Sequence, residues 1–175
     1  MARITIPEYE SLSAEAKREY DGQIKKHGRI TNMKKTLLHS VPSFKVLMEW
    51  YPLRDEVVKV VGEFSLNVYA YAVSHANQCL ICSTFFRKIL KDGGVNPDEL
   101  SLDETSELLA EYGAACVAQP VKVSDELFAR MRARFSEAEI VLLTAFAGMM
   151  IATNLINNAL EVKLDEYLVT YTEKK

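Results

Sequence analysis

One segment, SEAEIVLLTAFAGMMIATNLINNALEV (residues 136–162), constrains the fold more than any other part of the sequence. It opens with Ser136, a good N-cap, and Glu139 follows three residues later, a pattern typical of a capping box. From Ile140 to Ile151 the segment is apolar nearly all round, as expected for a helix that is covered on most sides. The sequence therefore predicts a long, buried central helix.

The remaining sequence also favours helices. The alternating polar and apolar pattern of half-buried strands is absent, and seven glycines and five prolines in 175 residues leave no long linker. Pro42 and Pro52 are interpreted as signals that stop the preceding helices. We expect an all-α chain that forms a single helical domain over residues 1–175. Its further helical segments are residues 11–28, 31–40, 43–51, 53–77, 79–94, 96–120 and 124–135.

Charge and hydropathy limit the partners of the chain. The net charge of −3 argues against a nucleic-acid partner, because phosphate backbones require a concentrated basic face. The first ten residues, MARITIPEYE, lack the apolar core of a secretory signal. The apolar run Ile140–Ala152 is shorter than the roughly 20 residues that span a bilayer. We therefore expect a cytoplasmic protein with neither a nucleic-acid nor a membrane partner.

The segment SHANQCLICSTFFRKIL (residues 74–90) holds two of the three cysteines, Cys79 and Cys82, at C-x-x-C spacing, and His75 precedes them by four residues. In a reducing compartment such a pair is more often catalytic or metal-binding than a structural disulfide. If Asn77 ends the preceding helix, Cys79 would begin the next one, where unpaired amides favour a thiolate. Redox chemistry, a metal site that includes His75, and simple core packing all remain open. A closed zinc site needs four ligands, and no second C-x-x-C exists, so we expect neither a metal nor a cofactor.

With these residues in view, the chain resembles the alkylhydroperoxidase D / carboxymuconolactone decarboxylase family. The resemblance is carried by AYAVSHANQCLICSTFFRKILKDGGVNPDEL, similar to a family helix, a G-C-x-x-C turn and a second helix, and it extends over about residues 28–168. It implies a compact helical fold and a homo-oligomer, commonly a trimer or hexamer. It also implies that Cys82 attacks a small peroxide or disulfide and that Cys79 closes the disulfide. A lipoyl or thioredoxin-like reductant would then restore the dithiol.

The sequence departs from the family's motif at three positions. Asn67 stands where the family has a glutamate, Phe86 where it has a histidine, and Gln78 where it has the turn glycine. Neither Asn67 nor Phe86 titrates, so the family's proton relay is missing. His75 is the candidate replacement, because a histidine near the sulfurs can stabilise a thiolate or move its proton. Glu63 is a weaker candidate, and Cys116 is expected to be buried and inert.

Three functions follow from these observations. The first is a thiol-dependent peroxidase or disulfide oxidoreductase, with Cys82, Cys79 and His75 as its catalytic residues. The second is a decarboxylase-like lyase acting on a carboxylated lactone, against which the retained cysteines count. The third is a non-catalytic oligomer that kept the fold and lost the proton relay.

Overall fold

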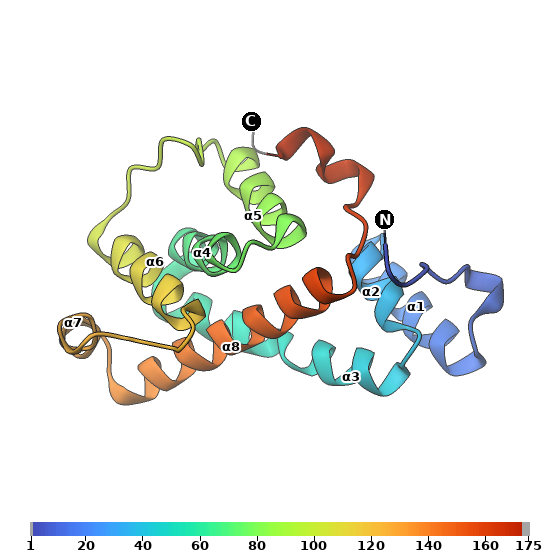
Figure 1. The fold of residues 1–175 in the computed structure, drawn as a ribbon, viewed down its shortest axis with the longest axis horizontal. Helices are drawn as coiled ribbons and strands as arrows, with labels where there is room; N and C mark the ends of the chain where they lie inside the picture. Colours follow the sequence, from blue (N-terminus) through green and yellow to red (C-terminus); the bar gives the residue numbers. More distant parts are fainter. Residues whose placement is uncertain (1, 173–175) are drawn as a thin grey trace.

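The computed structural model describes residues 2–172, and they form helices without a strand (Figure 1). The all-α expectation is therefore confirmed. Two short 3₁₀ helices, η1 (Tyr9–Ser11) and η2 (Glu166–Tyr171), flank the α-helices near the two ends. The α-helices are α1 (Ala14–His27), α2 (Asn32–Leu37), α3 (Val41–Glu49), α4 (Tyr51–Ala76), α5 (Leu80–Asp92), α6 (Glu104–Val117), α7 (Asp125–Arg134) and α8 (Glu137–Ala159).

Local sequence signals explain where most helices begin. Five N-cap side chains accept a hydrogen bond from the backbone N–H three residues on, which satisfies one of the unpaired amides of the first turn. At α8 the predicted capping box is present in full, with Glu139 accepting in return from the N–H of Ser136. At the C-terminal end of α1, Gly28 takes the left-handed conformation (φ 71°) and ends the helix. The five N-caps are Ser13, Thr31, Asp103, Ser124 and Ser136.

The helices expected before the two prolines do end before them, α2 at Leu37 and α3 at Glu49, but the prolines have a further role. Pro42 and Pro52 each lie in the first turn of the next helix, α3 and α4. A proline fits there because the N–H that it lacks would have no partner in the first turn. The helix expected over residues 53–77 is also interrupted: Gly62 has φ 78° and ψ 165°, so α4 consists of two helical parts joined at this residue.

The main core lies where α4 packs against α6 and α8. Tyr69, fully buried, donates a hydrogen bond of 2.9 Å to the carbonyl oxygen of Leu143 and so joins α4 to α8. On the other side of α4, Gly113 of α6 lies so close that a Cβ there would be 2.8 Å from both Tyr69 and Val73. The glycine allows this close approach of the two helices.

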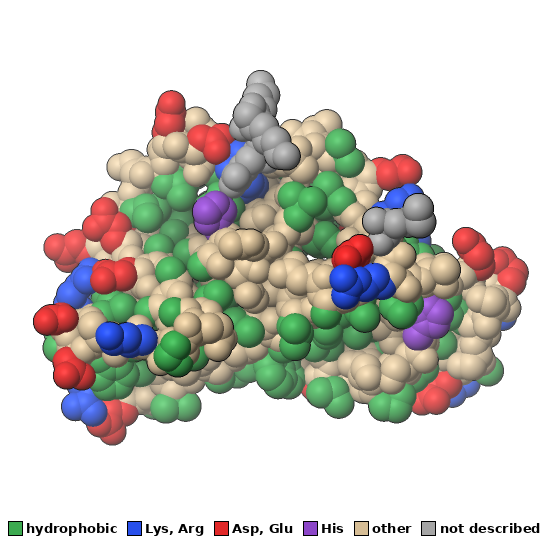
Figure 2. All heavy atoms as spheres, viewed as in Figure 1, with side chains coloured by type: hydrophobic (Ala, Val, Ile, Leu, Met, Phe, Trp, Pro, Cys, Tyr) green, Lys and Arg blue, Asp and Glu red, His purple; other side chains and the backbone are tan. Residues whose placement is uncertain are grey.

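A second hydrophobic cluster joins α1, α2 and α3 and also contacts the C-terminal end of α8 through Ile156. Figure 1 shows these three helices at one end of the long axis and α6 and α7 at the other, with α8 running between them. On the face in Figure 2, acidic and basic side chains are dispersed, and hydrophobic side chains lie between them.

We expected the apolar run Ile140–Ala152 to be too short to span a bilayer, but the helix that contains it, α8, is long enough to do so. Among residues 2–172, α8 is the one helix long and apolar enough for a span, at 23 residues. Length and composition do not separate such a helix from the core helix of a folded domain. In this chain α8 packs against α4, α6 and α7, and its buried side chains include Leu143, Phe146 and Asn154.

Candidate active site

The tight turn between α4 and α5 places the two cysteines. Cys79 is the N-cap of α5 and Cys82 lies in its first turn, as the sequence predicts. The left-handed residue is Gln78 (φ 51°), whereas Asn77, expected in that role, has φ −85°. The N–H of Cys79 donates to the carbonyl of Ser74 at 2.9 Å, which closes the turn. Both cysteines are thus held by backbone geometry at the start of a helix.

Both thiols are buried, reduced and in mutual contact. Cys79 is 1% exposed and Cys82 is 6% exposed, and neither forms a disulfide. The two thiols are hydrogen-bonded to each other. From α8, the side-chain amide of Asn157 donates to the sulfur of Cys82 at 3.2 Å and lies 3.8 Å from that of Cys79. One amide therefore serves both sulfurs.

This arrangement favours one thiolate shared by the pair. The hydrogen bond from Cys82 lowers the pKa of Cys79 to about 7, helped by backbone amides of α5 and by Asn157, although burial acts in the opposite direction. The pKa of Cys82 is raised well above its usual value by its role as donor to Cys79, by burial, and by the charge of Cys79. When the pair loses one proton, the negative charge is favoured on Cys79, at the N-terminus of α5, and the remaining proton on Cys82.

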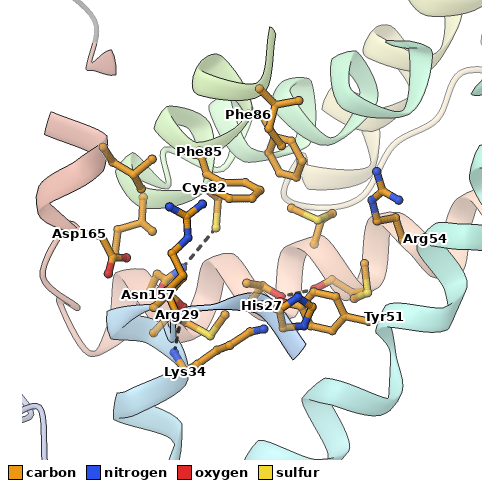
Figure 3. Close-up of a pocket in the computed structure, with 18 of the residues that line it drawn as sticks. His27, Arg29, Lys34, Tyr51, Arg54, Cys82, Phe85, Phe86, Asn157 and Asp165 are labelled. Carbon is orange, nitrogen blue, oxygen red and sulfur yellow. Dashed lines mark hydrogen bonds between the residues drawn. The ribbon is translucent and has the colours of Figure 1, made fainter. Parts of the chain in front are cut away.

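A pocket of about 440 Å³ reaches Cys82 but not Cys79. Figure 3 shows Cys82, Phe85 and Phe86 on one side of it and Lys34, His27 and Tyr51 on the opposite side. The wall between them comes from α8, with Met149, Met150, Thr153 and Asn157. A small molecule that enters the pocket therefore meets Cys82 first.

The arrangement of helices around this turn is shared with proteins of known structure. No protein-family model matches the sequence, and no curated protein matches it. Among solved structures, a protein from Ralstonia eutropha JMP134, described as an alkylhydroperoxidase AhpD core and an uncharacterized peroxidase-related protein, superposes with a TM-score of 0.73. The match has 16% sequence identity and covers 95% of this chain and 94% of the other. The chain has the alkylhydroperoxidase D fold.

A second solved structure agrees. An uncharacterized peroxidase-related protein from Silicibacter sp. TM1040 superposes with a TM-score of 0.75 at 15% identity, over 95% of this chain and 93% of the other. At such low identity the likeness establishes the alkylhydroperoxidase D fold and leaves the chemistry to be argued from the residues of this chain.

The residues predicted to replace the missing relay lie away from the pocket. His75, in the last turn of α4, is exposed, and its ring lies 5.7 Å from that of Tyr71; it is not among the residues that line the pocket. Its role as a proton relay therefore stays a prediction. Glu63 is 59% exposed and forms an ion pair with Arg54. Cys116 is buried, as expected, and burial raises the pKa of its thiol.

Of the three positions that depart from the family motif, Phe86 lies at the pocket and Asn67 is buried. Phe86 lines the pocket, where its ring packs edge-on against Phe85 at 5.3 Å between centroids. Asn67 is 7% exposed, and its side-chain oxygen has no hydrogen-bond partner among the described residues. Where the family has ionisable groups, this chain has a dry aromatic wall and a buried amide.

Sequence reasoning missed two residues of the site, one that donates hydrogen bonds to the sulfurs and one that lines the pocket. Asn157, on α8, is the only side chain outside the pair whose hydrogen bonds to the sulfurs are seen within residues 2–172. Tyr51 has a ring that is 41% exposed, yet burial around its hydroxyl, together with the charge of Cys82, raises the pKa of Tyr51 to about 12. Its hydroxyl is thus a stable proton donor that faces the same pocket.

No group of three or more His, Cys, Asp or Glu side chains that could hold a metal ion occurs in the described part of the chain. The arrangement of two thiols, one amide and a largely apolar pocket is suited to sulfur chemistry with a small molecule.

Proposed function

We propose that the chain is a thiol-dependent oxidoreductase in which Cys79 and Cys82 alternate between dithiol and disulfide while a peroxide or disulfide is reduced. The observation that carries the proposal is the hydrogen-bonded pair with one lowered pKa, at a pocket that reaches Cys82. Thiolate character and access together are what a nucleophilic cysteine requires.

The pair itself supplies the first proton transfer. Cys79 is a thiolate that accepts the proton of Cys82, its hydrogen-bond donor, and Cys82 becomes the nucleophile on the pocket side. Attack on a peroxide ROOH breaks the O–O bond and leaves a sulfenic acid on Cys82. The departing RO⁻ takes the proton from Cys79 and leaves as ROH. In this proposal the two cysteines exchange the proton between themselves, a transfer for which the family motif uses separate side chains.

The second half of the reaction forms the disulfide. The Cys79 thiolate attacks the sulfenic sulfur of Cys82, the S–S bond forms, and hydroxide departs and is protonated to water. Relative to the dithiol, the two cysteines have then lost two protons and two electrons, and the peroxide has become an alcohol and water. A dithiol reductant of the lipoyl or thioredoxin class restores the pair by thiol–disulfide exchange.

Mass spectrometry of the intact protein tests this proposal. One equivalent of tert-butyl hydroperoxide should remove two hydrogens from the native protein and from Cys116→Ser, the matched control at a buried cysteine. Cys82→Ser should show no disulfide and no turnover with dihydrolipoamide. If the native protein forms no disulfide, or Cys82→Ser turns over as fast as the native protein, the proposal is rejected and the non-catalytic alternative is favoured. His75→Asn, in the same assay, tests the remaining relay prediction.

We also propose a homo-oligomer, a trimer or hexamer as the resemblance implies. Exposed apolar side chains on the helices support it: Val141 and Leu155 of α8 are 68% and 62% exposed, and Val46 of α3 is 60% exposed. Apolar groups left in water on regular helices are candidates for burial between subunits. Light scattering coupled to size-exclusion chromatography measures the state directly, and a monomer at micromolar concentration contradicts the proposal.

A further inference from the structure

The charged side chains that line the pocket are more often positive than negative. Arg29, Lys34 and Arg54 line the pocket, and Asp165 is the one carboxylate among its lining residues. In Figure 3 the Lys34 side chain lies across the pocket from Cys82, with Phe85 on the cysteine's side. The thiol chemistry described above uses none of these cations.

Within residues 2–172 the Lys34 ammonium group has no ion pair with a carboxylate. It is half-buried, its hydrogen-bond partner is the neutral side-chain oxygen of Gln23 at 2.6 Å, and it lies 4.9 Å from the ring centre of Tyr51. Burial, and then the charge of Lys26, lower the pKa of Lys34 to about 8. Burying a charged group without an opposite charge beside it lowers the stability of the folded state. Lys34 is therefore expected to destabilise the protein.

Arg29 is the second cation that forms no ion pair with a carboxylate within the described residues, although its charge acts to lower the pKa of Asp165. Its guanidinium lies over the ring of Tyr167, 4.1 Å from the ring centre. The nearby Asp165 accepts a hydrogen bond of 2.9 Å from the backbone of Asn32, and burial raises the pKa of Asp165. Arg54 differs from both, because Glu63 already neutralises it. Two cations, Arg29 and Lys34, are therefore available to an anion in the pocket.

Most of the remaining pocket lining is apolar. It includes Ile81, Phe85 and Phe86 of α5 and Met149 and Met150 of α8, beside the polar Thr153 and Asn157. A pocket with an apolar middle and a few charged groups at one side fixes the orientation of a ligand that has the complementary charge. The charge selects one end of the ligand, and the apolar walls take its body.

From this arrangement, and resting on the function proposed above, we infer that the substrate is an anionic molecule with an apolar body. Lys34 and Arg29 bind its carboxylate, and its disulfide or hydroperoxide group lies against the sulfur of Cys82. Neutral substrates of the same shape bind less well because they leave both cations unpaired.

Binding of a non-reactive pair of probes tests the charge preference apart from any redox step. Isothermal titration of the native, reduced protein at pH 7 compares octanoate with octanamide, which differ only in the charged end. We expect octanoate to bind about tenfold more tightly or better, as for a hydrogen-bonded charge pair in a partly desolvated site. Lys34→Gln and Arg29→Gln should each remove most of this preference. Lys122→Gln, which deletes the same charge from an exposed loop, should leave it unchanged.

Equal affinities for the acid and the amide, or no binding of either, would overturn the inference, as would equal effects of Lys34→Gln and Lys122→Gln. The thermal unfolding midpoint of each variant shows that the fold is retained.

A single-turnover experiment separates this inference from the proposed function. The reduced protein is mixed with lipoate or with lipoamide, disulfides with and without a negative charge, and formation of the protein disulfide is followed. Faster oxidation by lipoate supports both proposals. Equal rates with the two disulfides leave the thiol function standing and reject the anion pocket. No oxidation by either, together with charge-dependent binding of octanoate, rejects the thiol function and retains the pocket.

Discussion

Replacing Asn157 by leucine should raise the pKa of the reactive thiol. Its amide donates to the sulfur of Cys82 at 3.2 Å and lies 3.8 Å from that of Cys79, and it stabilises negative charge on the pair. Leucine branches at Cγ as asparagine does and has no donor, so the substitution removes this hydrogen bond and keeps the shape of the side chain, although leucine is the larger residue.

The size of the effect follows from the hydrogen bond that is lost. A hydrogen bond to a charged group contributes about 1.5–3 kcal/mol, and sulfur, a weak acceptor, places this one at the lower end. Since one pKa unit corresponds to about 1.4 kcal/mol, the pKa of Cys79 should rise by about one unit from its value of about 7. At pH 7 the thiolate fraction then falls from about one half to about one tenth, a roughly fivefold decrease in reactivity.

The measurement is the rate of alkylation by iodoacetamide between pH 5 and pH 10, with Cys116→Ser as background so that Cys79 and Cys82 alone react. Asn158→Leu, the same substitution at the next residue of α8, is the matched control, because the Asn158 amide donates to the carbonyl of Asn77 and not to a sulfur. If the midpoint in Asn157→Leu equals that in Asn158→Leu, Asn157 does not stabilise the thiolate, and the electrostatic account of the site is refuted.

Three further predictions concern the turn, the core and the pH profile. Gly113→Ala should destabilise the protein by about 1–3 kcal/mol in urea unfolding, because its Cβ would overlap α4, whereas Gly148→Ala, in open space on α8, should be neutral or stabilising. Gln78→Gly should stabilise the protein by about 0.5–1 kcal/mol, because glycine adopts φ 51° without strain. A loss of stability in this variant would show that the backbone at Gln78 is not strained. In the native protein alkylation should increase as pH rises through about 7, where Cys79 loses its proton, and level off above pH 8; a midpoint near 9 would show that its pKa is not lowered.

The parts of the fold that depend on local chemistry could be predicted from the sequence. The capping box of Ser136 and Glu139 and the stop at Gly28 involve side chains and backbone groups within a few residues, so the signal lies in one window. The sequence did not reveal that Pro42 and Pro52 lie in the first turns of helices, because α2, α3 and α4 follow one another with short connections. A proline between two helices then fits the end of one and the first turn of the next equally well.

The candidate site also contains some residues that the local sequence predicts and others that it does not. Cys79 at the start of α5 is a local feature, and the sequence predicts it. Asn157 lies 78 residues from Cys79, and Lys34 and Tyr51 belong to still other helices. Nothing in their own neighbourhoods distinguishes them, since only tertiary packing brings them to the sulfurs. His75 is the opposite case: it lies close to the cysteines in the sequence, its side chain is exposed and outside the pocket lining, and its role as a relay stays a prediction.

The break at Gly62 divides α4 into a part that carries Tyr51 and a part that leads to the cysteine turn. Lys34 lies on α2, within the group of helices joined by the α1–α3 cluster, whereas Cys79 and Cys82 form a small cluster of their own with Ile81. Val162 packs against both clusters. Under the proposed function, substitutions of Lys34 that alter ligand preference would leave in place the α5 amides and Asn157, which lower the pKa of Cys79.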